Sequence, residues 1–161
     1  MKLAGRTWVF EDDINTDLLY PAACFRLPAD ERPWLTMSAN RPGWSREVRS
    51  GDLLVAGTNF GTGSSRPAAD NLKALGIAGV LAESVNGLFF RTAINSGLPV
   101  LEAPGIRALV PEGTIVEADL ETGLIRTAGR ELKVKPLPPF LARILADGGL
   151  LSRLRKEGYI D

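Results

Sequence analysis

The spacing of hydrophobic residues changes along the chain, and its middle has the clearest pattern. Two short apolar runs, at 53–56 and 77–82, lack polar alternation, which is typical of strands covered on both faces. Between them, apolar residues recur at helical spacing from Pro67 onward, and Gly76 suits the end of a helix. We therefore expect a strand–helix–strand unit with parallel strands and a right-handed crossover.

Similar patterns on both sides of this unit predict more strands and a second helix. Residues 121–123 have the composition of a turn between two strands, and Gly97 follows a segment with helical periodicity. The elements expected from these patterns are a strand at 6–10, a helix at 88–96, and strands at 98–101, 114–118, 124–127 and 131–134. The middle of the chain is thus predicted to be α/β.

Two regions are less regular. Prolines, glycines and polar residues between 28 and 51 predict a long irregular excursion. We expect Trp34 and Trp44 to pin this excursion to the body of the protein, with contact to a partner as the second interpretation. Near the C-terminus, apolar residues at helical spacing in 140–145 and 150–154 predict two helices that dock on the chain's own core.

Composition favours one compact domain over residues 1–161, without a strong electrostatic field. The chain has 19 lysines and arginines against 19 aspartates and glutamates, so charge does not argue for nucleic acid or an anionic membrane as a partner. The sequence has neither a run of about 20 apolar residues nor the apolar core of a secretion signal. We expect a cytoplasmic protein.

Two absences restrict the chemistry further. The chain has no histidine, and Cys24 is its only cysteine. Histidine-based triads, an internal disulfide, a four-cysteine iron–sulfur site and the usual structural zinc sites are therefore impossible within this chain. If the protein takes part in demanding chemistry, we expect another molecule to bring the cofactor.

The loop 57–67 is the strongest candidate site, because it connects the strand at 53–56 to the following helix. Its three glycines permit backbone conformations that other residues avoid. At its end, Ser64, Ser65 and Arg66 offer two hydroxyls and a guanidinium, which suit a carboxylate or a phosphate at a helix N-terminus. The alternative interpretation is a glycine-rich turn with a serine cap and no further role.

Several familiar glycine-loop sites do not match this sequence. A P-loop requires lysine after the last glycine, where this chain has Ser64, and the glycine spacing differs from the dinucleotide-binding fingerprint. A serine-hydrolase elbow would need a histidine. Because serine is a poor base when unperturbed, proton chemistry at Ser65 would need electrostatic help, for which we expect a metal centre on a partner subunit.

Other polar residues have ordinary explanations when their sequence pattern is taken alone. The segment Ile14–Asp17 has the composition of a polar turn whose side chains bond nearby backbone. A lone arginine such as Arg26 is most often a solvated side chain. Neither pattern by itself predicts a site.

Three motifs together resemble a known family along nearly the whole chain. They are Asp12–Asp17 with Pro21, Gly51–Arg66, and Phe90–Pro99. In combination they are similar to the small subunits of 3-isopropylmalate dehydratase, the short form of the aconitase-family swivel domain. The resemblance implies a swivelling β/β/α domain of the α/β class, with a mixed sheet and helices. It also implies a separate large subunit that carries a [4Fe–4S] cluster.

The resemblance also implies roles for individual residues. Ser65 matches the catalytic serine that moves the substrate's α-proton, Ser64 would assist it, and Arg66 would hold a substrate carboxylate. Thr16 and Asp17 match a threonine–aspartate pair near the active site, so the turn-only interpretation of this segment becomes less favoured.

Arg26 matches a substrate-contacting arginine, in a segment where the family is thought to set substrate choice. Here the local sequence Cys24–Leu27 departs from the usual tyrosine-leucine-arginine-threonine. Pro67 and Ala68 replace the common glutamate and histidine, and Thr62 replaces a frequent cysteine. These departures affect the expected substrate more than the expected reaction.

The leading hypothesis is a hydro-lyase subunit that acts with its large subunit on a hydroxy-dicarboxylate. The first candidate substrate is 3-isopropylmalate, which would place the protein in leucine biosynthesis. Related acids of the dimethylmalate, citramalate or homoaconitate type are alternatives. A non-catalytic anion-binding module is the rival hypothesis, motivated by Pro67 and Ala68. A free-standing lyase is not expected, because this chain has no ligand set for the cluster.

Overall fold

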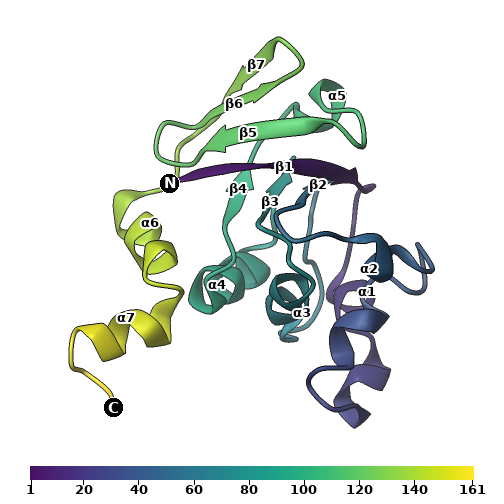
Figure 1. Cartoon of the computed structure of the whole chain (residues 1–161), viewed down its shortest axis with the longest axis vertical. Coiled ribbons are helices and arrows are strands. Elements are labelled where there is room, and N and C mark those ends of the chain that lie inside the picture. The colour runs from purple at the N-terminus through teal and green to yellow at the C-terminus, as the bar shows by residue number, and fades with distance from the viewer.

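One seven-stranded sheet, in the order β4-β3-β2-β1-β5-β6-β7, forms the centre of the computed structural model, which describes all residues from Met1 to Asp161. Its parallel half contains β1 (Lys2–Val9), β2 (Leu53–Ala56), β3 (Gly79–Ala82) and β4 (Val100–Glu102). Its antiparallel half adds β5 (Ile115–Asp119), β6 (Leu124–Thr127) and β7 (Arg130–Lys133). Figure 1 shows the antiparallel strands above the parallel ones.

Strand β1 belongs to both halves of the sheet. Its last residues, Thr7–Val9, pair in parallel with β2, whereas Lys2–Arg6 pair in antiparallel register with β5. The strand therefore begins four residues before the predicted start at Arg6 and ends one residue earlier than expected. Pairing with β5 extends it, and this long-range contact is invisible to local β-propensity.

Helices and short 3₁₀ turns connect and cover the strands. The α-helices are α1 (Thr16–Leu19), α2 (Trp44–Glu47), α3 (Ala68–Ala74), α4 (Gly87–Ser96), α5 (Ile106–Leu109), α6 (Pro139–Ala146) and α7 (Leu150–Lys156). The 3₁₀ segments are η1 (Ala22–Arg26) and η2 (Arg32–Leu35). The parallel β2–α3–β3 unit, α4 and the β5–β6–β7 meander confirm the predicted elements, whereas the short helices α1, α2 and α5 were not expected. The longest helix has ten residues, too few to span a bilayer.

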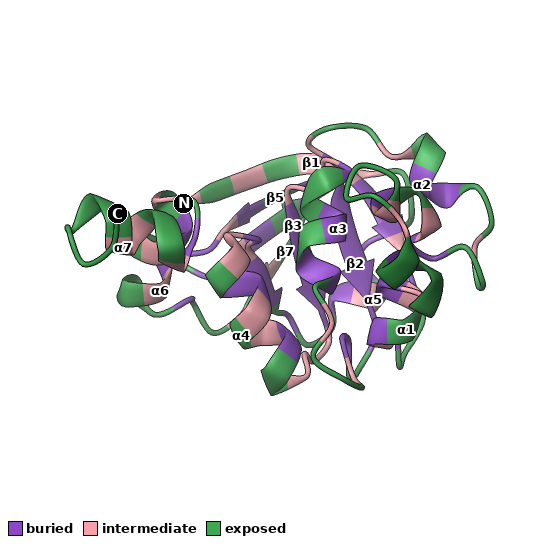
Figure 2. Ribbon diagram, turned by 90° about the horizontal axis from the view of Figure 1, so that it is seen from below, coloured by how far each residue is buried: buried purple, intermediate pink, exposed green.

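Apolar residues on the two faces of the parallel strands form two separate cores. On β2, Leu54 and Ala56 pack in the core that contains α3 and Phe89, whereas Leu53 and Val55 pack in the core beneath β5 and β6. All four β2 residues are fully buried, as the uninterrupted apolar run predicted. Figure 2 shows this buried centre between more exposed loops and helices.

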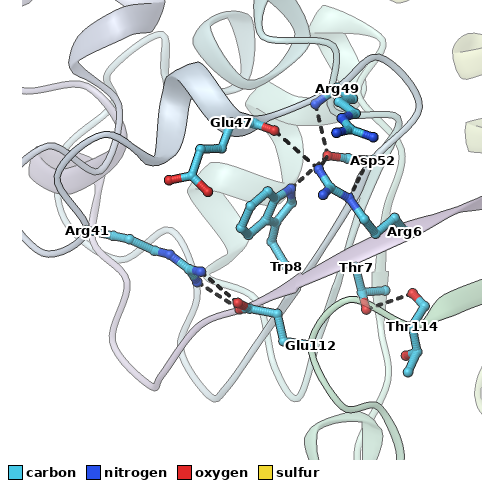
Figure 3. Close-up of polar contacts among 9 residues, drawn as sticks. All are labelled: Arg6, Thr7, Trp8, Arg41, Glu47, Arg49, Asp52, Glu112 and Thr114. Atoms are coloured by element: carbon cyan, nitrogen blue, oxygen red, sulfur yellow. Dashed lines mark hydrogen bonds and ion pairs between the residues drawn. The ribbon is translucent and has the colours of Figure 1, made fainter.

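A polar network attaches the irregular excursion to β1 (Figure 3). Asp52, which is buried, accepts hydrogen bonds from Arg6 Nη2 at 2.7 Å, from Trp8 Nε1 at 2.7 Å and from the backbone N–H of Arg49 at 2.9 Å. Burial alone would raise the pKa of Asp52, but these donors outweigh it and hold the pKa below its ordinary value. The carboxylate therefore fixes the end of the excursion.

The two tryptophans of the excursion have different environments. Trp44 is fully buried and packs edge-to-face on Trp8 and Phe10, which confirms its expected pinning role. Trp34 is 46% exposed, with the guanidinium of Arg46 stacked over its ring. The pinning interpretation is therefore wrong for Trp34, because its short 3₁₀ turn leaves the ring at the surface.

The two C-terminal helices also differ in how they pack. Helix α6 buries Ala142 and Leu145, which confirms the prediction that it docks on the chain's core. Helix α7 buries no residue, and Leu151 on it is 58% exposed. Ion pairs from Arg153 and Lys156 to Asp147 hold α7 instead. The docking prediction is thus wrong for α7, whose apolar stripe is too short to reach the core.

Candidate functional site

The candidate site is the loop between β2 and α3, at the carboxyl end of the parallel strands. Gly61 has a φ of +77°, and a Cβ there would lie 2.3 Å from the Cβ of Phe89. Gly63 has a φ of +110°, and a Cβ there would lie 2.9 Å from Thr16 Oγ1. Glycine is needed at both positions because left-handed backbone coincides with close contact to a neighbouring segment.

The segment before α1 runs alongside this loop and is bonded to it. The N–H of Gly61 donates to Ile14 O at 2.7 Å, and the N–H of Thr16 donates to Thr62 O at 2.8 Å. These two bonds bring the predicted threonine–aspartate pair beside the predicted serines, although about 48 residues separate them in the sequence. The structure therefore unites two of the three motifs.

Asp12 supports the other end of the loop, a role that sequence reasoning did not assign. Its Oδ1 accepts the N–H of Thr58 at 2.7 Å, and Arg107 Nη1 lies 3.4 Å from the same oxygen. The hydrogen bond from Thr58 holds the pKa of Asp12 below its ordinary value. The acidic residues before Asn15 gave the only sequence signal for this contact.

Arg66 is the centre of the candidate site, because its guanidinium contacts several segments. Nη2 lies 2.7 Å from Asp17 Oδ1, and Nη1 donates to Tyr20 O at 2.8 Å. Nε donates to Ser64 Oγ at 3.2 Å. The side chain is 19% exposed, so it is only partly accessible to solvent. The guanidinium therefore has a fixed orientation in which an exposed carboxylate already occupies its outer edge.

Ser64 and Ser65 lie on the surface and precede the first turn of α3. The helix begins at Ala68, and its N-cap, Pro67, makes no side-chain capping bond. The serine-cap interpretation is therefore wrong, because no serine side chain caps α3. Arg66, whose Nε donates to Ser64 Oγ, is the cationic group that the structure places beside Ser64.

The turn interpretation of residues 14–17 fits Asn15 but not Thr16. Asn15 Oδ1 accepts the N–H of Leu18 at 3.0 Å and caps α1, which is ordinary turn chemistry. Thr16 is 3% exposed, and its hydroxyl has no hydrogen-bond partner, even though a buried hydroxyl normally has one. The turn-only interpretation explains Asn15 but not Thr16 or Asp17.

Arg26 takes no part in the contacts around Arg66, whereas its neighbour Phe25 does. Arg26 is exposed at the end of η1, and no hydrogen bond or ion pair joins its side chain to the residues around Arg66. Phe25 does approach the site, since the guanidinium carbon of Arg66 lies 5.6 Å from its ring centroid. Phe25 is 61% exposed, and its ring centroid lies 5.2 Å from that of Tyr20. Sequence reasoning noted the unusual segment but did not identify Phe25.

The side chains of this chain do not suit an iron–sulfur cluster. Cys24 is fully buried, and burial raises the pKa of its thiol, which disfavours the thiolate needed for ligation. The structure contains no group of three potential metal ligands, and the chain has no histidine. The hydroxyls of Ser64 and Ser65 and the guanidinium of Arg66 therefore suit a carboxylate ligand better than a metal ion.

Comparisons with known proteins agree with this architecture. Residues 30–105 match the family model of the aconitase C-terminal domain. The chain is 42% identical to 3-isopropylmalate dehydratase small subunit 1 of Methanopyrus kandleri, over 97% of this chain and 94% of that protein. It is 41% identical to the methanogen homoaconitase small subunit of Methanothermobacter thermautotrophicus, over 96% of this chain and 91% of that protein.

A solved structure shows the same fold over the full length. It is the crystal structure of 3-isopropylmalate dehydratase from Methanocaldococcus jannaschii, which superposes with a TM-score of 0.90 at 34% identity. The alignment covers 99% of this chain and 96% of that one. The α/β fold with a mixed sheet, as implied by the three motifs, is thereby confirmed.

Proposed function

Because this chain belongs to the family of 3-isopropylmalate dehydratase small subunits, we propose that it forms half of the active site of a hydro-lyase. Together with a large subunit, it would interconvert a hydroxy-dicarboxylate and an unsaturated diacid. A proton leaves the carbon next to a carboxylate, and hydroxide leaves the neighbouring carbon. Water and a carbon–carbon double bond result, and the reverse step restores the hydroxy acid.

The observation that carries this proposal is the oriented guanidinium of Arg66 beside two exposed serines. A planar guanidinium binds a carboxylate through two parallel hydrogen bonds. Nη1 and Nε are held by Tyr20 O and Ser64 Oγ, while Nη2 faces the exposed carboxylate of Asp17. We assign Arg66 to a substrate carboxylate and Asp17 to holding the guanidinium until substrate arrives.

Ser65 would carry the α-proton, with Ser64 and Thr16 assisting at the same site. An alkoxide is favoured by a nearby cation only where water is excluded. Ser65 is exposed in the free subunit, so a partner surface has to cover it. We therefore propose that the subunit alone is inactive. The buried, unpaired hydroxyl of Thr16 provides one more donor directly below Gly63.

The [4Fe–4S] cluster implied by the family would reside on the large subunit. The side chains of this chain do not suit it, and Cys24 is buried away from the surface. When bound to its own subunit, the cluster would supply a Lewis acid for the leaving hydroxyl. The residues of this chain would bind the carboxylate, orient the substrate and move the proton.

We propose 3-isopropylmalate as the first candidate substrate, which would make leucine biosynthesis the pathway. Citramalate-, dimethylmalate- and homoaconitate-type acids are alternatives, since a similar relative is named as a homoaconitase subunit. Phe25 lies beside the site with its apolar ring, and the exposed Arg26 follows it in the sequence. An apolar substrate side chain would pack on Phe25, whereas an additional carboxylate would select Arg26.

Anaerobic reconstitution tests the proposal. The purified chain is combined with the cluster-loaded large subunit of a 3-isopropylmalate dehydratase, and ultraviolet absorbance reports the unsaturated diacid. We expect turnover of at least one hydroxy-diacid by the complex and none by either subunit alone. A complex that assembles but leaves every acid of the panel unchanged would contradict the catalytic proposal and favour the anion-binding module.

A further inference from the structure

A buried amide on α3 connects the serine–arginine loop to the segment that carries Phe25 and Arg26. Asn71 is 3% exposed and lies five residues after Arg66. Its Nδ2 group approaches three oxygen acceptors, which are Leu19 O at 3.2 Å, Arg32 O at 3.3 Å and Thr36 Oγ1 at 3.2 Å. Two amide hydrogens are thus shared among acceptors at both ends of the segment 19–36.

The acceptors lie on either side of η1, so Asn71 holds this segment as a closed loop against α3. The carbonyls of Leu19 and Arg32 precede and follow the five residues of η1. The backbone provides another closure, since the N–H of Met37 donates to Leu18 O at 2.8 Å. Asn71 is therefore a buried side chain that helps to set how far η1 lies from the helix that follows Ser65.

Arg66 forms a second connection between the same two elements. It donates to Tyr20 O at 2.8 Å, and its guanidinium carbon lies over the ring of Phe25 at 5.6 Å. A shift of η1 away from α3 would change both of these contacts. The position of Phe25 and Arg26 relative to the guanidinium therefore depends on Asn71, although Asn71 itself lies beneath the surface.

We propose that Asn71 is a positioning residue for substrate selectivity, which it sets by fixing the distance between η1 and Arg66. This inference rests on the proposed function, because selectivity is defined only for an active complex. Replacing the amide with an apolar group of similar size leaves the carbonyls of Leu19 and Arg32 without a buried donor. The segment then moves toward solvent, and the wall formed by Phe25 moves with it.

The experiment compares two substrates of different size in the reconstituted complex. The variants are Asn71→Leu, which removes both donor hydrogens, and Thr36→Val, which removes one acceptor with little change of volume. Asn95→Leu is the matched control, because Asn95 is exposed on α4. For each complex, kcat and KM are measured separately with citramalate and with 3-isopropylmalate, normalised to the amount of assembled protein.

We expect Asn71→Leu to change the ratio of the two kcat/KM values by about tenfold, mainly through KM, as loss of one positioning contact would. Thr36→Val should shift the ratio in the same direction by a smaller factor, and Asn95→Leu should leave it unchanged. A purely structural role would reduce the amount of assembled protein and leave the ratio of the two kcat/KM values unchanged. Hydrogen exchange should also accelerate at the Leu27 and Trp34 amides in Asn71→Leu.

Each outcome distinguishes the inference from the proposed function. If the wild-type complex is active and the ratio of the two kcat/KM values in both variants stays within about twofold of the wild-type ratio, the role of Asn71 is overturned. The proposed function would be unaffected by that result. If Asn71→Leu does not fold, the ratio in Thr36→Val decides, and an unchanged ratio there overturns the inference. A wild-type complex that assembles but turns over no acid of the panel would overturn the proposed function, and the selectivity role would fall with it.

Discussion

At the scale of single residues, Arg66 is the residue to which we assign recognition of the substrate carboxylate in the proposed site. Its three nitrogens contact Asp17, Tyr20 and Ser64, which come from both sides of the site. Lysine would keep the charge but could satisfy only part of this set, because an ammonium lacks the planar fork. The geometry of the guanidinium, and not only its charge, should therefore matter.

Arg66→Lys is expected to lower kcat/KM by about 10- to 100-fold, mainly through KM, because charge-assisted hydrogen bonds are worth roughly 1.5–3 kcal/mol. Assembly with the large subunit should be unchanged. Steady-state kinetics on the reconstituted complex checks this result, with Arg143→Lys as a control at an exposed position on α6. An unchanged kcat/KM would remove Arg66 from the site.

Residues of the site differed in how far the sequence could reveal them. Ser64, Ser65 and Arg66 follow a strand and a run of glycines, so both pattern and family resemblance identified them. Phe25 and Asn71 could not be found in this way. Their importance depends on contacts between η1 and α3, and neither an exposed aromatic nor an asparagine within a helix has a distinctive local pattern.

Elements of the fold were predictable where a local pattern decided them. The β2–α3–β3 unit and α4 follow from apolar spacing, with Gly97 ending α4 at a φ of +78°. Strand β1 was predicted too short, because Lys2–Gly5 become a strand by pairing with β5. Helix α7 formed as expected but did not bury its apolar stripe. Such differences arise where distant contacts override local preference.

The network around Asp52 makes a prediction about how β1 and the excursion hold together. Asp52→Asn places an amide opposite the donors Arg6, Trp8 and the Arg49 N–H, and we expect it to lower the free energy of unfolding by about 2–4 kcal/mol. Urea denaturation checks this value. Asp70→Asn, at an exposed position on α3, is the control. A loss below about 0.5 kcal/mol would show that the network contributes little.

The same network predicts the direction of an acid effect. Because the folded-state pKa of Asp52 is lowered, its stabilising contribution is complete above the unfolded pKa of about 4 and decreases as pH falls through the folded value. The hydrogen bonds from Arg41 lower the pKa of Glu112 and act in the same direction. The wild type should therefore lose stability below about pH 4. Asp52→Asn should lose less over that interval.

The whole molecule places its candidate site at a surface rather than in a closed cavity. Ser64 and Ser65 are exposed, and Arg66 is partly exposed. A site of this kind can bind and orient a carboxylate but cannot exclude water on its own. The full-length similarity to small subunits and the donor set of this chain both agree with an active site completed by a second subunit.

The kcat of the reconstituted complex that contains Ser65→Ala tests the central claim most directly. We expect kcat to fall by about 10³-fold, with KM and assembly close to the wild type, because the variant removes the group that moves the proton and leaves the carboxylate contact intact. Ser38→Ala, at an exposed turn, should retain wild-type kcat. A Ser65→Ala complex with kcat within about tenfold of the wild type would contradict the assignment of Ser65 as the catalytic residue.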